Sequence, residues 1–214
     1  MTASIFLTSS GNTVIQDVVE KLGRDPASLR TAFITTASET EGPDLEWLNK
    51  DREGVSQAGF DLFDYTVTDK NSEQVAEDLK GVSVIYVAGG NTFYLLLQFR
   101  KCGFAHFIRK FMDNGGIYIG SSAGSIVTAP NITIAKRIEK KDYEEELVTF
   151  EGFSLVDFIV LPHWGSDYFR EIYLSERIEN AYTEGNKIIL LTDTQYVMVD
   201  GDKYKIIDVG DESS

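Results

Sequence analysis

Short β-rich runs alternate with longer stretches of helical periodicity along the whole chain of 214 residues, and this alternation constrains the fold most strongly. It is typical of a layered α/β domain built on a mainly parallel sheet. The pattern predicts strands at residues 5–8, 31–35, 61–65, 82–87, 116–120, 158–161 and 187–191, then a hairpin of residues 196–200 and 203–209. Helices are expected at residues 14–22, 45–58, 72–79, 92–100, 105–114, 123–129 and 169–183. We expect one domain over residues 1–214, with residues 210–214 as a frayed tail.

Cysteine content and the N-terminal residues indicate a compartment. Cys102 is the one cysteine, so an internal disulfide is excluded and a reducing environment fits. The first residues have neither a basic region nor a long apolar run, which predicts no signal peptide and no membrane span. We therefore expect a cytoplasmic protein, monomeric or homodimeric, with no membrane partner.

The net charge of −14 argues against nucleic-acid binding, because such a surface repels the phosphate backbone. One basic cluster, residues 136–141, runs directly into acidic residues and is typical of a solvated surface. It lies in residues 131–150, a charged and weakly periodic stretch. That stretch is either a flap over a site or a plain surface insertion.

The segment Gly120-Ser121-Ser122-Ala123-Gly124 joins a predicted buried strand to a predicted helix. It matches G-x-S-x-G, the pattern of a nucleophile elbow, in which small flanking residues permit a strained turn that lifts the serine hydroxyl above the sheet. Ser122 is then the candidate nucleophile, and the amide of Ala123 a candidate oxyanion donor. Ser121 and Ser125 are weaker candidates, and the alternative is a structural glycine turn.

A serine hydroxyl needs a base, and the chain has two histidines. His163 follows the predicted strand at 158–161. Open α/β sheets place their sites at the carboxyl ends of their strands, which is where this histidine is expected. His106 lies within a helical run and is interpreted as a helix-surface or packing residue. His163 is therefore the candidate base, with a satisfied loop histidine as the alternative.

The orienting acid is less constrained, because carboxylates are numerous. Asp193 again follows a strand end and can reach His163 from a neighbouring strand. Asp142 and Glu144 are alternatives, and Asp193 can also be a turn residue that bonds its own backbone.

A second strand-turn-helix junction occurs at residues 84–93, which read Val-Ile-Tyr-Val-Ala-Gly-Gly-Asn-Thr-Phe. The amide of Gly89 or Gly90 is a candidate second oxyanion donor. Asn91 and Thr92 are candidates for substrate binding, and either can instead be an ordinary helix N-cap.

At residues 88–93, 120–124, 161–163 and 191–193 the chain resembles the peptidase E family, which comprises α-aspartyl dipeptidases and cyanophycinase-like relatives. The resemblance implies a three-layer α/β sandwich like that of the class I glutamine amidotransferases, a flavodoxin-like arrangement. It also implies a serine peptidase that acts on short peptides without a metal or other cofactor.

Two departures from the family concern the third catalytic residue and the specificity. The family's aspartyl dipeptidases carry an acidic residue soon after the elbow, where this chain reads Ile134-Ala135-Lys136-Arg137, so Asp193 is favoured. Specificity for an N-terminal aspartate uses an arginine after the catalytic histidine, and Arg170 and Arg177 are both candidates. Two competing interpretations are a non-catalytic ligand-binding or regulatory protein on the same fold, and an esterase or amidase.

Overall fold

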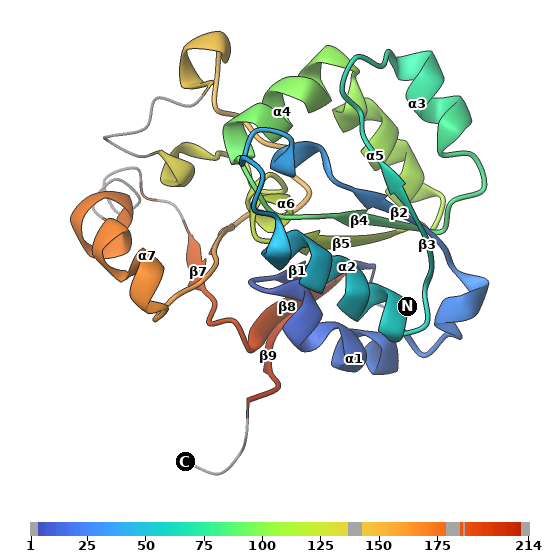
Figure 1. Ribbon diagram of the computed structural model, residues 1–214, viewed down its shortest axis with the longest axis horizontal. Helices are drawn as coiled ribbons and strands as arrows, with labels where there is room; N and C mark the ends of the chain where they lie inside the picture. The colour runs from blue at the N-terminus through green and yellow to red at the C-terminus, as the bar shows by residue number, and fades with distance from the viewer. Residues whose placement is uncertain (1–3, 137–142, 179–184, 186, 211–214) are drawn as a thin grey trace.

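The computed structural model describes residues 4–136, 143–178, 185 and 187–210, and it is organised around a seven-stranded sheet (Figure 1). The strand order is β3-β2-β4-β5-β1-β8-β9. The parallel strands are β1 (Ile5–Thr8), β2 (Arg30–Ile34), β3 (Asp61–Tyr65), β4 (Val84–Val87) and β5 (Ile117–Ser121). The antiparallel hairpin of β8 (Gln195–Asp200) and β9 (Lys203–Asp208) extends the sheet beyond β1.

Helices cover both faces of this sheet (Figure 1). One layer consists of α1 (Gly11–Leu22) and α2 (Glu46–Gln57), and the opposite layer of α3 (Ser72–Asp78), α4 (Thr92–Lys101) and α5 (Phe104–Asp113). Side chains alternate between two cores accordingly: Phe6 packs with the α1 and α2 side, whereas Ile5 and Leu7 pack with the other. The predicted α/β sandwich with a mainly parallel sheet is thereby confirmed.

Two strands form a small sheet of their own. β6 (Ile159–Leu161) pairs in parallel with β7 (Ile188–Leu190), and neither belongs to the seven-stranded sheet. The reason is that β1 is already paired on both edges, with β5 on one side and β8 on the other. The small sheet packs against the main core through Val160 and Ile189.

The helix predicted at 169–183 differs from the one observed. α7 spans Asp167–Ile172 and continues as a π-helical turn over Tyr173–Arg177, while residues 179–184 lie outside the described residues. The helix begins early because the hydroxyl of Ser166 accepts a hydrogen bond from the amide of Phe169, which caps its N-terminus. Among the described residues, no helix has the length and apolar character that crossing a membrane requires.

Candidate active site

Ser122 lies on a sharp turn between β5 and the short helix α6 (Ala123–Ile126). Its φ of 50° and ψ of −107° are a conformation that residues other than glycine rarely adopt. The turn is held in place because the amide of Ser122 donates to the carbonyl of Thr8, at 3.1 Å, and so continues the β1–β5 pairing. Backbone strain of this kind concentrates at functional sites.

Gly120 and Gly124, two residues before and after Ser122, must be glycine because neighbouring backbone approaches them too closely for a side chain. A Cβ atom on Gly120 would lie 2.5 Å from the carbonyl oxygen of Gly124. One on Gly124 would lie 2.1 Å from the carbonyl oxygen of Val87. Both neighbours are rigid backbone, so the G-x-S-x-G spacing reflects the packing of the turn against β4.

Replacing Gly124 with alanine is therefore expected to lower the free energy of unfolding by about 3 kcal/mol, since the added methyl group has no room to relax. Gly23→Ala is the matched control: its φ is +60° but nothing lies within 4 Å of the new Cβ. That control should lose only about 1 kcal/mol from backbone strain. Urea unfolding of both variants measures the difference, and equal losses would contradict the steric explanation.

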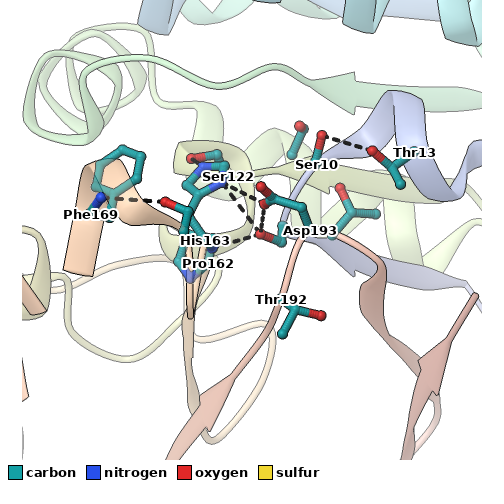
Figure 2. Close-up of polar contacts among 12 residues, drawn as sticks. Ser10, Thr13, Ser122, Pro162, His163, Phe169, Thr192 and Asp193 are labelled. Atoms are coloured by element: carbon teal, nitrogen blue, oxygen red, sulfur yellow. Dashed lines mark hydrogen bonds and ion pairs between the residues drawn. The ribbon is translucent and has the colours of Figure 1, made fainter. Parts of the chain in front are cut away.

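The structure brings Ser122, His163 and Asp193 into one hydrogen-bonded chain (Figure 2). His163 Nε2 lies 2.9 Å from Ser122 Oγ, and His163 Nδ1 lies 2.7 Å from Asp193 Oδ1. His163 follows β6 and Asp193 follows β7. Because these two strands are parallel neighbours, the residues after them meet at the same edge of the small sheet.

The imidazole ring is fixed from several directions. Phe169 stacks on it with ring centroids 4.9 Å apart and an interplanar angle of 11°. The backbone of His163 has a φ of 61°, and its carbonyl accepts from the amide of Ser166. Ring orientation is therefore set by packing as well as by hydrogen bonds.

Ser9, which sequence reasoning did not identify, connects β1 to this chain of hydrogen bonds. Its hydroxyl donates to Asp193 Oδ1 at 2.7 Å, and its oxygen accepts from the backbone amide of His163 at 2.6 Å. The side chain is completely buried. The available signal was its position directly after the buried strand at residues 5–8, at the same carboxyl edge of the sheet as Ser122.

The proton positions follow from the charge of Asp193. Its hydrogen bond with His163 holds the pKa of this carboxyl below its ordinary value, with a further contribution from Ser9 and against the effect of partial burial. An ionised carboxylate only accepts hydrogen bonds, so Nδ1 of His163 carries a proton, and in the neutral ring Nε2 then presents its lone pair to Ser122. This is the tautomer that a general base requires.

Backbone amides lie beside Ser122 without partners. Within the described part of the chain, the amides of Gly89, Gly90 and Ala123 have no hydrogen-bond acceptor. A Cβ on Gly89 would lie 3.3 Å from Ser122 Cβ, which places this backbone against the side chain of Ser122. Gly90 must be glycine, because its φ is 130° and a Cβ would lie 2.3 Å from the carbonyl oxygen of Ala37.

Ser122 opens into a cavity of about 580 Å³ at the carboxyl edge of the sheet. The residues that line it come from the segments that follow β1, β4 and β6, from the end of β5 and from the neighbouring helices: Ser9, Ser10, Asn12, Glu41, Trp47, Lys50, Asp51, Gly89, Gly90, Asn91, Thr92, Phe93, Ser121, Ser122, Ile126, Ala135, Pro162, His163, Tyr168 and Phe169. Asn91 also caps α4, since its side chain accepts from the amide of Tyr94 at 2.9 Å. Of residues 131–150, the stretch predicted as a flap or insertion, Ala135 reaches the cavity.

Other candidates from the sequence lie elsewhere. Arg170 is exposed and lines a different hollow with Trp164 and Tyr173, so the structure does not bring it to Ser122. His106 is exposed on α5. Asp142 lies outside the described residues, and the side chains of Glu144 and Arg177 are not described either. The hydroxyl of Ser125 is buried and donates to the carbonyls of Thr8 and Gly120.

Asp51, on α2, is a buried carboxyl in the cavity wall. Its Oδ1 accepts from the hydroxyl of Tyr86 at 2.7 Å and from the amide of Asn12, at the start of α1, at 2.8 Å. Burial raises the pKa of Asp51 from its ordinary 3.8 to about 6, although these bonds and Ser121 oppose the rise. Keeping this group ionised at neutral pH therefore costs stability.

Asp51→Asn is accordingly expected to raise the free energy of unfolding by about 2 kcal/mol at pH 8. The shift to about 6 corresponds to about 3 kcal/mol, and the lost attraction to the N-terminus of α1 returns up to about 1. Because the folded pKa is the higher one, the penalty is absent well below pH 3.8, grows as the pH rises above that value and is complete above about 6. Urea unfolding at pH 4 and pH 8 measures it, with Glu53→Gln on the exposed side of α2 as control. A variant whose gain is the same at both pH values would contradict this account.

The α/β fold and the strained turn at Ser122 are typical of hydrolases with a nucleophile elbow, and sequence comparison identifies the family. Residues 5–207 match the sequence profile of Peptidase family S51, so the chain belongs to this family and is a serine-type peptidase. Within the described residues, no group of three or more His, Cys, Asp or Glu side chains is arranged to hold a metal ion.

Relatives cover nearly the whole chain. An uncharacterised peptidase of Pasteurella multocida is 30% identical over 198 residues, covering 92% of this chain and 94% of its own. One of Listeria innocua is 29% identical over 199 residues and covers 92% of both. A solved structure of a candidate peptidase E protein from Listeria monocytogenes superposes with a TM-score of 0.85 at 25% identity, covering 98% of this chain and 100% of that one. The peptidase E family predicted from the sequence is thereby confirmed.

Proposed function

We propose that this peptidase hydrolyses short peptides by a Ser122–His163–Asp193 mechanism. The observation that carries the proposal is the unbroken chain from Asp193 through both ring nitrogens of His163 to Ser122 Oγ, with bonds of 2.7 and 2.9 Å. It is the relation between nucleophile, base and orienting acid that acyl transfer requires.

In the first half of the reaction, Ser122 Oγ attacks the scissile carbonyl carbon while its proton passes to His163 Nε2. Asp193 stabilises the resulting imidazolium. The tetrahedral oxyanion accepts hydrogen bonds from the free amides of Ala123 and of Gly89 or Gly90. His163 then protonates the leaving amine as the C–N bond breaks, which leaves an acyl ester on Ser122.

In the second half, water replaces the departed amine. His163 takes a proton from this water as it attacks the ester carbonyl, and the same amides bind the second oxyanion. Collapse of this intermediate breaks the ester bond and returns the proton to Ser122 Oγ. The acid product leaves, and the enzyme regains its starting protonation state.

The size of the cavity favours short substrates, since about 580 Å³ falls in the range of pockets that enclose small ligands. We therefore expect a dipeptidase or another exopeptidase. A preference for N-terminal aspartate needs a cation near the scissile bond. Of the described residues that line the cavity, Lys50 is the only lysine or arginine, and it pairs with Glu46 at 2.7 Å. The aspartyl preference is therefore tested as one case among several.

The test is labelling of the purified protein with a fluorophosphonate, peptide mapping of the adduct, and a panel of Asp-X, Ala-X and Lys-X dipeptides with matched esters. We expect modification at Ser122 that is lost in His163→Ala, together with dipeptide hydrolysis. Hydrolysis of esters alone would favour an esterase. An intact fold with neither labelling nor turnover would favour a ligand-binding protein.

A further inference from the structure

The helix α2 contributes Trp47, Lys50 and Asp51 to the lining of the cavity, and the mechanism above uses none of these side chains. Trp47 and Asp51 are four residues apart and thus lie on one face of this helix. The ring of Trp47 lies 3.5 Å from the Cβ position of Gly89, which is itself 3.3 Å from Ser122 Cβ. Asp51, one turn further along, lines the same cavity.

The carboxyl of Asp51 is buried and is held in place by hydrogen bonds. The residue is 5% exposed, and both the Tyr86 hydroxyl and the Asn12 amide donate to the same oxygen, Oδ1. Neither of these two bonds involves Oδ2, and the Ser121 side chain is a further hydrogen-bonding neighbour of the carboxyl. Gly11 makes room for the pair, since a Cβ there would lie 2.7 Å from Asp51 Oδ1 and 1.8 Å from the Tyr86 hydroxyl oxygen.

Among the described residues that line the cavity, no lysine or arginine forms an ion pair with this carboxyl. The charged residues of that lining are Glu41, Asp51 and Lys50, with His163 as the other titratable base, and Lys50 pairs with Glu46. A buried carboxylate without a cation is unfavourable, so it gains strongly when a cation binds beside it. A carboxylate retained at a stability penalty within a cavity is typical of a functional group.

We propose that Asp51 is the binding site for a protonated amino group of the peptide substrate. The inference deepens the proposed function and rests on it for the identity of the ligand as a peptide. The amino group has two possible sources with the same chemistry: the α-ammonium of the N-terminal residue and the side chain of an N-terminal lysine. Two matched pairs of ligands distinguish them.

Binding is measured calorimetrically at pH 8 in the Ser122→Ala background, so that the ligands are not consumed. Ala-Ala is compared with N-acetyl-Ala-Ala for the α-ammonium, and N-acetyl-Lys-Ala with N-acetyl-norleucyl-Ala for the side chain. We expect one charged ligand to bind about 100-fold more tightly than its neutral partner, and this ratio to fall below about 5-fold when Asp51→Asn is added. Glu53→Gln, the control on the exposed side of α2, should leave the ratio unchanged. Asp51→Ser replaces the asparagine variant if that variant does not fold.

The outcomes separate the two proposals. An unchanged ratio in the Asp51 variant, or no preference for either charged ligand, overturns the assignment of Asp51. Absence of fluorophosphonate labelling in the protein with Ser122 overturns the catalytic proposal instead, and charge-selective binding that depends on Asp51 would still support the present inference. A merely structural Asp51 would change the affinities of charged and neutral ligands equally.

Discussion

Replacing Ser122 with alanine is expected to lower kcat/KM for short peptides by about 10⁴-fold or more, because the three residues of a triad act as a unit. The substitution removes the only atom that can form the acyl ester. It leaves the amide of Ser122 bonded to the carbonyl of Thr8, and it leaves the flanking glycines in place. The fold should therefore survive, with a thermal unfolding midpoint within a few degrees of that of the unmodified protein. Steady-state kinetics on the dipeptide panel and thermal unfolding measure the two quantities.

Ser125→Ala is the matched control for that experiment. Ser125 lies in the same turn, but its hydroxyl is buried and donates to two backbone carbonyls at 2.8 Å. The control should lose about 1 kcal/mol of stability and less than about 10-fold in turnover. If Ser122→Ala kept near-normal turnover, or if Ser125→Ala alone abolished it, the nucleophile would be assigned incorrectly.

Local patterns predicted the elements of the main sheet well. β1 and β3 have the predicted bounds, and β5 begins one residue later than expected. These strands were predictable because hydrophobic patterning and turn residues are short-range signals. The nucleophile elbow was predictable for the same reason. Its two glycines are required because a side chain at either position would clash with neighbouring backbone in any turn of this kind. Strand ends also indicated correctly that His163 and Asp193 lie at one edge.

Long-range pairing was not predictable in the same way. Nothing in the local sequence of residues 158–161 and 187–191 distinguishes a strand of the main sheet from one of a separate sheet. Whether these strands join the main sheet depends on β8, which pairs with the free edge of β1 although the two strands are far apart in the sequence. The positions of Ser9 and Asp51 in the site were not predictable for a related reason. Ser9 contacts partners more than 150 positions away. Asp51 lies in a charged helix, and the residues that contact its carboxyl, Tyr86 and the amide of Asn12, are more than 30 positions away in the chain.

Replacing Asp193 with asparagine is expected to lower kcat/KM by about 10³-fold, or about 4 kcal/mol of transition-state stabilisation. The variant loses the negative charge that stabilises the imidazolium of His163. Asp61→Asn, exposed at the far edge of the sheet on β3, is the control and should have no effect. Kinetics with saturating and limiting dipeptide measure the loss, which we expect in kcat rather than in KM.

The hydrogen bond from Ser9 is the reason why Asp193→Asn should lower kcat/KM less than Ser122→Ala does. Its hydroxyl donates to Asp193 Oδ1, so it favours an oxygen rather than an amide nitrogen at that position in the asparagine variant. The productive tautomer of His163 is then retained, and charge alone is lost. Ser9→Ala by itself should cost about 10-fold in kcat. In combination with Asp193→Asn it should cost more than the product of the single effects, because the amide is then free to turn its nitrogen toward Nδ1 and select the wrong tautomer. Losses that simply multiply would show that Ser9 orients nothing.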